Sequence, residues 1–289
     1  MKFAMSKSIK VVGVSRGNEF SPNHVGNDAA IFNKVVETLS GLGCDVQVYT
    51  EKEFIGEPAI VADVIFNMAR DRRSISRLKE LEDAGCLVIN SAYGIDNCVR
   101  QPMTELLIQN HVPHPYSQIV EVDDCLDGMD YPCWIKRGDS HAMVKEDVCY
   151  VTSSEEACDV LVDFKERGIP TAVVNEHLFG DLIKFYGVKD SEFFYWFYPS
   201  PCSHSKFGLE KINGEAQGFQ FEEKELKEYC QEAASVLNVP VYGGDCVVAS
   251  DGKIQIIDFN DWPSFARCRE EAGESIAAYI YEQAIKLEK

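Results

Sequence analysis

Short apolar runs and longer amphipathic segments alternate along the first hundred residues. The apolar runs predict β-strands at residues 9–15, 45–50, 62–69 and 86–90. Apolar residues at helical spacing, each series followed by a glycine, predict helices at 29–43 and 74–85. Strands that alternate with helices indicate a parallel sheet covered by helices, and such sheets bind ligands at the carboxyl ends of their strands.

The pattern changes after a helix predicted at residues 100–110. A proline-punctuated turn then leads into a strand, which places a boundary near residue 112. Further helices are predicted at 153–168 and 222–238 and from about residue 271 onward. Further strands are predicted at 132–138, 171–178, 181–188, 192–199, 244–250 and 253–260. The last two flank an Asp-Gly pair, which is typical of a hairpin turn, so we expect them to pair.

Charge and cysteine content restrict the expected partners. The chain has 289 residues and a net charge of −19 at pH 7, with a pI near 4.7. Such a surface repels nucleic-acid phosphates and anionic lipid, so we expect neither nucleic acid nor a membrane as a partner. Eleven cysteines without a C-x-x-C pair, and no apolar leader segment, favour a cytoplasmic protein with reduced thiols.

The predicted hairpin carries polar residues within apolar strands. Asp258 and Asn260 lie two residues apart and therefore share one face of their strand, and Asp245 lies in the partner strand. Strand pairing would bring the two carboxylates opposite each other, where they repel unless a cation lies between them. Mg²⁺ prefers such oxygen ligands. The pattern predicts a metal site of these three residues; the alternative is a pair of solvated acids at a sheet edge.

Two lysines suit a phosphate beside that metal. Lys136 ends an apolar strand before a loop of small polar residues, and Lys184 lies inside an apolar strand. A lysine is costly to bury unless it faces an anion. Each lysine alone is more often a surface residue whose stem packs on apolar neighbours. Together with the acidic hairpin, the two lysines favour a site for a metal-bound nucleotide.

In this order, the motifs resemble the ATP-grasp proteins of the glutathione synthetase type. The resemblance covers most of residues 90–270, and the hairpin is its most specific part. It departs from the family pattern at two places. Asp258 stands where a glutamate is commoner, and the loop after Lys136 has one glycine, Gly138, where many members have several. The second departure leaves open whether this loop closes on the nucleotide.

The resemblance implies a mixed α/β fold, α+β in the ATP-grasp part. Residues 1–111 would form a Rossmann-like pre-ATP-grasp domain that holds the acceptor substrate. Residues 112–178 would form the central ATP-grasp lobe, and residues 179–289 the C-terminal lobe with the metal site. Homodimers are common among proteins of this kind, so the resemblance admits a homodimer, and the sequence leaves the oligomeric state open.

The resemblance also implies cofactors, ATP with Mg²⁺ or with Mn²⁺ in its place, and their contacts. Lys136 is expected at the α- and β-phosphates, and Lys184 at the γ-phosphate or the acceptor. Glu176 is expected at the adenine and Asp181 at the ribose. The other nucleotide contacts that it implies are Arg100, Ser140, His141, His177 and Leu178.

Candidates for binding the acceptor follow the predicted strands. Ser15 and Arg16 follow the first strand, Arg70 follows the strand at 62–69, and Arg267 follows the hairpin. Arginines at strand ends suit a carboxylate or a phosphate, so we expect an anionic small molecule.

The activity that the resemblance implies is an ATP-dependent carboxylate–amine ligase. A substrate carboxylate would take the γ-phosphoryl group, and an amine or similar nucleophile would attack the acyl phosphate, with Lys184 and Arg267 acting on the reacting groups. Two alternatives stay open. The Lys184 strand and the hairpin also resemble the inositol polyphosphate kinases, which stop at phosphoryl transfer. A non-catalytic nucleotide-binding protein is the other alternative.

Overall fold

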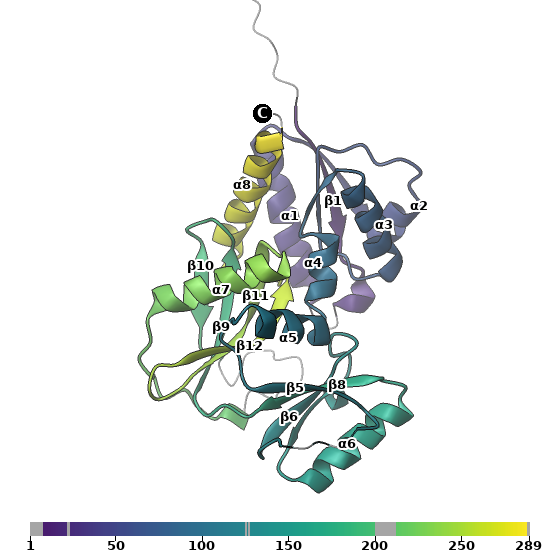
Figure 1. Cartoon of the computed structure of the whole chain (residues 1–289). Helices are drawn as coiled ribbons and strands as arrows, with labels where there is room; N and C mark the ends of the chain where they lie inside the picture. Colours follow the sequence, from purple (N-terminus) through teal and green to yellow (C-terminus); the bar gives the residue numbers. More distant parts are fainter. Residues whose placement is uncertain (1–7, 22–23, 125, 127, 200–211, 288–289) are drawn as a thin grey trace, which may run out of the picture.

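The computed structural model describes residues 8–21, 24–124, 126, 128–199 and 212–287, which form three four-stranded sheets (Figure 1). The first sheet has the strand order β2–β1–β3–β4 and is parallel throughout, which confirms the parallel sheet predicted from the sequence. Its strands are β1 (Lys10–Ser15), β2 (Asp45–Thr50), β3 (Val64–Asn67) and β4 (Leu87–Ile89).

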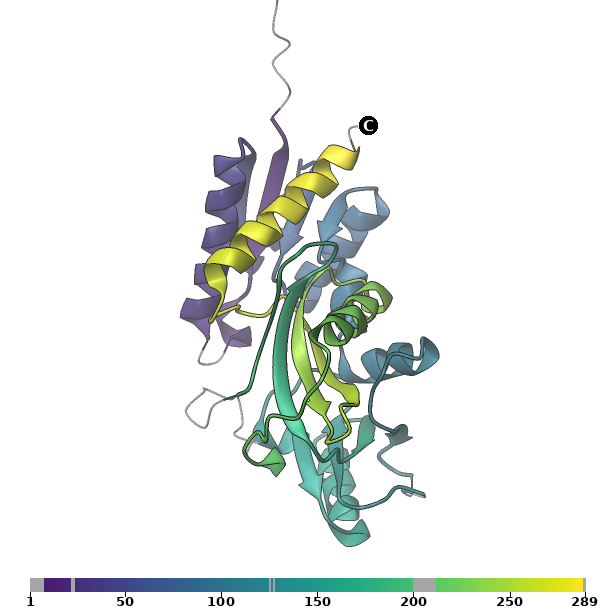
Figure 2. The same cartoon turned by 90° about the vertical axis from the view of Figure 1, so that its left-hand side faces the viewer.

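Helices cover both faces of the first sheet because successive side chains of a strand point to opposite faces. Val12 and Val14 belong to the core beneath α2, α3 and α4, whereas Val11 belongs to the core beneath α1 and α8. Helices α1 and α8 lie side by side (Figure 2). The bounds are α1 (Val25–Gly41), α2 (Glu51–Gly56), α3 (Arg72–Asp83), α4 (Ala92–Asn97) and α8 (Arg269–Leu287).

The second sheet is antiparallel, has the order β5–β8–β6–β7 and forms a separate lobe. Helix α6 covers one face, where Leu161 and Phe164 pack with Ile135 and Val174. Helix α5 (Arg100–Gln109) precedes this lobe in the chain. The elements of the lobe are β5 (Ser117–Glu121), β6 (Cys133–Arg137), β7 (Val148–Val151), α6 (Ser154–Glu166) and β8 (Thr171–Glu176).

The third sheet is also antiparallel, with the order β10–β9–β11–β12. Helices α5 and α7 cover one face, where Leu226 and Leu237 join Phe185, Ile256 and other apolar residues in one core. Residues that alternate with these, among them Lys184, point to the opposite face. The elements are β9 (Asp181–Val188), β10 (Phe194–Phe197), α7 (Glu223–Leu237), β11 (Val241–Val248) and β12 (Ile254–Asp261).

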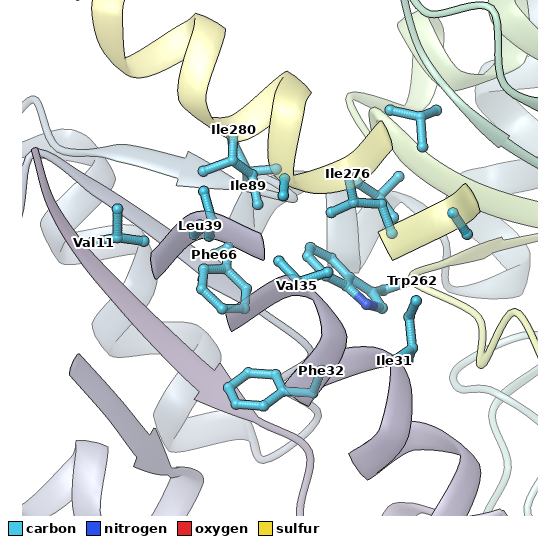
Figure 3. Packing of buried hydrophobic residues seen from close by; sticks show 14 of the residues in the cluster. Val11, Ile31, Phe32, Val35, Leu39, Phe66, Ile89, Trp262, Ile276 and Ile280 are labelled. Carbon is cyan, nitrogen blue, oxygen red and sulfur yellow. The ribbon is translucent and has the colours of Figure 1, made fainter. Parts of the chain in front are cut away.

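The first and third sheets share one hydrophobic core. Trp262 directly follows β12, yet it is fully buried beside Phe66 of β3, with the two ring centroids 5.8 Å apart (Figure 3). Ile31 and Val35 of α1 and Ile276 of α8 belong to the same cluster. The second sheet has its own core, formed by residues of 120–174. The N-terminal and C-terminal parts of the chain therefore pack as one body, to which the lobe of β5–β8 is joined.

Most of the predicted helices and strands are confirmed, with ends that shift by a few residues. The sequence pattern missed α2, α4 and β7, which span six, six and four residues and are too short to show a clear period. It also missed two short 3₁₀ helices at Asn18–Phe20 and Lys145–Asp147.

Two further expectations concern cysteines and membranes. All nine cysteines within the described part of the chain are free thiols, and Cys125 and Cys202 lie outside it. Among the described residues, no helix has both the length and the apolar character needed to cross a bilayer.

Candidate functional site

The hairpin brings the three predicted metal ligands together. Strands β11 and β12 pair so that Asp245 lies directly opposite Asp258, and a register shift follows between Asp245 and Cys246. Asn260 lies two residue pairs further along, on the same face, opposite Gly243. The Asn260 amide donates to Oδ2 of Asp258 over 3.2 Å. The predicted strand pairing is confirmed, and the metal role of the three residues stays a prediction.

A row of side chains crosses the third sheet at this point. Lys184 of β9 is the register partner of Asp245 on its other side, and Phe197 of β10 is the next residue in the row. The Lys184 ammonium donates to both oxygens of Asp245, over 3.0 and 3.1 Å. The residues of this row are, in order, Phe197, Lys184, Asp245 and Asp258. One cation, Lys184, therefore lies next to the first of two adjacent carboxylates.

Arg100 and Lys136 approach this row from other parts of the fold. Arg100, at the start of α5, places Nη1 3.3 Å from Oδ1 of Asp258. Lys136 of β6 extends from the second sheet and donates to the carbonyl of Ile257 over 3.3 Å. Burial works to raise the pKa of Asp258, but Arg100 and Lys136 together bring that pKa below its ordinary value. Asp258 therefore stays an anion.

The buried Lys136 has a strongly depressed pKa. Its side chain is 7% exposed, and burial, reinforced by the charge of Arg100, lowers the pKa to about 7, although Asp258 and Asp245 act in the opposite direction. A phosphate placed beside this amine would favour the charged form and restore an ordinary ion pair. The site thus holds a lysine whose charge at neutral pH depends on a nearby anion.

A second charged group lies at the end of β12. Arg70, which follows β3, pairs with Asp261 at 2.5 Å and also donates to the Asp261 carbonyl over 3.2 Å. His141 of the loop after β6 lies near both residues. Burial and the charges of Arg70 and Arg100 lower the pKa of His141 to about 4, against the opposing effect of Asp261 and Asp258. The His141 imidazole is therefore neutral.

Three other residues were predicted to bind the acceptor, and they differ in how many hydrogen bonds they already make within the protein. Arg16 pairs with Asp28 at 3.0 Å and donates to the carbonyls of Trp262 and Met68, so its guanidinium is held from several sides. The hydroxyl of Ser15 donates to the Tyr49 carbonyl over 3.4 Å. Arg267 is exposed and stacks over the ring of Phe197, with 4.2 Å from its guanidinium carbon to the ring centroid.

The segment between β8 and β9 holds the residues expected to contact adenosine. Glu176 accepts the Tyr116 amide at Oε1 over 2.7 Å. His177 accepts from the indole nitrogen of Trp134 over 3.1 Å. Leu178 is half-buried in the same segment. The hydroxyl of Ser140, in the loop beyond Lys136, donates to the carbonyl of His141 over 3.2 Å.

Asp181 has a different environment from the one expected for a ribose contact. Its side chain is buried, and its two oxygens accept the backbone amides of Gln217 and Phe219 over 2.6 and 2.8 Å. Both oxygens are thus used by the segment that leads into α7. A role at the ribose stays a prediction.

Three residues of this region escaped the sequence pattern. Asp261 directly follows the hairpin motif, and Trp134 lies two residues before Lys136 on the same face of β6. Tyr186 lies two residues after Lys184, and burial raises the pKa of its phenol to about 12. The ring of Tyr186 fills the space that a side chain at Gly243 would need. The sequence did hold a signal for Trp134 and Tyr186. Each lies two residues from a predicted site lysine and therefore shares its face of the strand.

The donor set suits a hard divalent cation. Within the described part of the chain, no group of three or more His, Cys, Asp and Glu residues is placed to hold a metal. The candidate set is two carboxylates and one amide, all of which offer oxygen, as Mg²⁺ requires. Mg²⁺ commonly uses one or two protein carboxylates and completes its coordination with phosphate oxygens and water, so this set fits it.

Comparison with known proteins gives matches in structure but not in sequence. No protein-family model and no curated protein matches the sequence. D-alanine–D-alanine ligase from Bacillus anthracis superimposes with a TM-score of 0.67 at 12% identity, covering 97% of this chain and 98% of that chain. The structure of that enzyme complexed with ATP gives the same TM-score and coverage at 11% identity. The ATP-grasp ligase PsnB, complexed with a minimal precursor, gives 0.63 at 15% identity, covering 96% of this chain and 100% of that chain. The chain therefore has the fold of the ATP-grasp ligases.

Proposed function

We propose that this protein is an ATP- and Mg²⁺-dependent ligase that joins a small-molecule carboxylate to an amine. One observation carries the proposal. Asp245, Asp258 and Asn260 share one face of a hairpin, and Lys184 and Lys136 reach the same place from the neighbouring strand and from the second sheet. Cations and hard oxygen donors gathered in this way match the needs of a metal-bound polyphosphate.

The nucleotide would lie between the second and third sheets. In this arrangement Lys136 and Arg100 contact its phosphates, and Glu176, His177 and Leu178 contact its base. Mg²⁺, held by Asp245, Asp258 and Asn260, would neutralise phosphate charge. Lys184 would leave Asp245 and pair with the γ-phosphate instead. A lysine–phosphate pair would then replace a lysine–carboxylate pair, so the lysine would keep an anionic partner.

The proposed reaction has two steps. A carboxylate oxygen of the first substrate attacks the γ-phosphorus, the bond to the β-phosphate oxygen breaks, and ADP leaves. The amine then attacks the acyl carbon, a C–N bond forms, and the C–O bond to phosphate breaks. Phosphate leaves with that electron pair, and the amine proton goes to it. Lys184 would stabilise the charge that develops on the transferred phosphoryl group.

The division of the chain follows from this proposal. Residues 1–111 would act as a Rossmann-like pre-ATP-grasp domain, residues 112–178 as the central lobe, and residues 179–289 as the C-terminal lobe with the metal site. The exposed Arg267 beside Phe197 lies at the end of the Lys184 row and would orient an anionic substrate. Its exposure contrasts with Arg16, whose guanidinium is already held by protein groups.

The test combines ADP release with trapping of the acyl phosphate. Purified protein is incubated with Mg·ATP, hydroxylamine and a panel of carboxylates, and hydroxamate is measured by its iron(III) complex. We expect at least one carboxylate to give hydroxamate together with stoichiometric ADP. Asp258→Ala and Lys184→Ala should lower the rate by roughly 10³-fold. Asp251→Ala, at the exposed turn of the same hairpin, is the matched control and should retain the wild-type rate.

Two other outcomes would contradict the ligase. A hydroxyl compound that yields ADP and a stable phosphate ester, with no hydroxamate from any acid, would indicate a kinase. Binding of Mg·ATP without ADP release for any acceptor, in wild type and Lys184→Ala alike, would indicate a nucleotide-binding protein without catalysis.

A further inference from the structure

Residues from three parts of the chain meet beside the end of β12. Arg70 comes from the loop after β3, His141 from the loop after β6, and Asp261 is the last residue of β12. Asp261 directly follows Asn260, so this corner adjoins the proposed metal site. The sequence pattern predicted Arg70 at the acceptor, the family resemblance implied His141 at the nucleotide, and neither gave Asp261 a role.

Asp261 is a buried carboxylate with one oxygen unused. Its side chain is 1% exposed, and Oδ2 is paired with Arg70. Among the described residues, Oδ1 has no hydrogen-bond partner and no contact with solvent. Leaving a buried acceptor unsatisfied is unfavourable, and a ligand that donates a hydrogen bond to it would remove this cost.

His141 offers a second unused atom in the same corner. Its Nε2 is shielded from solvent and lacks a hydrogen-bond partner in the described part of the chain. Because the imidazole is neutral, one of its ring nitrogens is an acceptor. The corner therefore presents a carboxylate oxygen and an imidazole nitrogen, and neither is satisfied by the protein.

The charges of the corner favour a ligand that brings N–H groups. Arg70 neutralises Asp261, and Arg16, which acts on Arg70 electrostatically, is itself paired with Asp28. The unused Oδ1 is a hydrogen-bond acceptor without a proton to donate, so an added anion would find no donor there. A primary amine instead carries two N–H donors, or three when it is protonated, and can donate to both the Asp261 oxygen and the His141 nitrogen.

We propose that Asp261 and His141 form the subsite for the amine substrate of the ligase, a primary amine that donates to Asp261 Oδ1 and His141 Nε2. This inference rests on the proposed function and names the second substrate by its chemistry. The position fits, since Asp261 adjoins Asn260 and the amine would lie beside the acyl phosphate. Both atoms are shielded from solvent, so the amine can reach them only when the surrounding residues move apart.

Isothermal titration calorimetry tests the subsite without turnover. Wild-type protein, saturated with Mg²⁺ and the non-hydrolysable analogue AMP-PNP, is titrated with methylamine, ethanolamine and each common amino acid. We expect at least one of these amines to bind at 1:1 stoichiometry. Asp261→Asn and His141→Leu should each weaken that binding at least about tenfold, as expected for loss of a hydrogen bond to a charged ligand. Tetramethylammonium, which has no N–H, should not bind.

Asp28→Asn is the matched control. Asp28 is also buried and arginine-paired, but among the described residues it has no fully buried oxygen that lacks a hydrogen-bond partner, so this variant should bind the amine like the wild type. If Asp261→Asn fails to fold by circular dichroism, His141→Leu decides, because it leaves the Arg70–Asp261 pair intact. The subsite is refuted if no amine binds the wild type, if the folded variants bind as well as wild type, or if tetramethylammonium binds equally well.

The outcome is separable from that of the ligase test. Hydroxamate formation by the wild type without an effect of Asp261→Asn or His141→Leu on amine binding would retain the ligase and reject the subsite. Amine binding that depends on both residues, with no hydroxamate from any carboxylate, would retain the subsite and reject the ligase.

Discussion

Replacing Lys136 by methionine should make the nucleotide-free protein more stable. The difference between a pKa of about 7 and the ordinary 10.5 corresponds to about 5 kcal/mol, an upper bound on the cost of this buried lysine at pH 7. Methionine keeps the apolar stem and removes the charge, while Asp258 retains Arg100 and Asn260 as partners. Replacing a buried ionic group by an apolar one commonly stabilises by about 1 to 4 kcal/mol, and we expect a gain in that range.

The gain should depend on pH in a definite direction. A cation whose folded pKa lies below its ordinary value destabilises the fold most at and below the folded pKa, here about 7. As the pH rises from 7 toward 10.5, the proton is held only in the unfolded state, and stability rises. At pH 9 the cost falls to about 2 kcal/mol at most. The advantage of Lys136→Met should therefore shrink by more than half between pH 7 and pH 9.

Urea unfolding with EDTA present measures this prediction at the two pH values. Lys145→Met, at an exposed lysine, is the control and should leave the free energy of unfolding unchanged. Adding Mg²⁺ and AMP-PNP at a hundred times the Kd should stabilise the wild type by about 2.7 kcal/mol, and much less of this should remain in Lys136→Met. A variant that is no more stable at pH 7, or whose advantage is the same at pH 9, would refute the argument from burial.

Three further substitutions test the packing around the site, each by urea unfolding. Asn90→Ala removes an amide that donates to the Val241 carbonyl and accepts its N–H over 2.7 and 2.9 Å, so we expect a loss of about 3 kcal/mol. Asp147→Asn breaks a buried carboxylate held by two arginines and two backbone amides, and should cost about 3 to 5 kcal/mol at pH 7. These partners outweigh burial and lower the pKa of Asp147 from its ordinary value, so the wild type should keep this stabilisation above that value and lose it as the pH falls from there through the lower pKa of the folded state. Trp262→Ala empties the core shared by the first and third sheets and should cost about 3 to 5 kcal/mol, with both regions unfolding together by amide hydrogen exchange.

Residues close in sequence were the ones that could be placed from the sequence. The hairpin of Asp245 and Asp258 was predictable because an Asp-Gly turn fixes strand pairing, and pairing fixes which side chains lie opposite each other. The strand that carries Lys184 was predicted with the bounds it has in the structure, since an apolar run with flanking turn residues marks both ends.

Pairs joined across the whole chain could not be placed from the sequence. Arg70 and Asp261 lie 191 positions apart, and Arg16 reaches the Trp262 carbonyl over 246 positions. Periodicity predicts a helix or strand. It does not predict which distant residue a charged side chain at the end of that element will contact once the elements have packed. Asp181 shows the same limit, because its two oxygens are used by backbone amides that no motif marks.

The division of the core determines how the site is assembled. Asp245, Asp258 and Asp261 lie on the third sheet, which shares its core with the first sheet through Trp262, and Arg70 extends from that first sheet. These acidic groups and Arg70 therefore keep fixed relative positions. Lys136 and His141 belong to the second sheet and its loop, whose core is separate. In the proposed function, a nucleotide phosphate placed beside Lys136 would favour the charged form of this lysine, so nucleotide binding would stabilise the position of the second sheet beside the carboxylates.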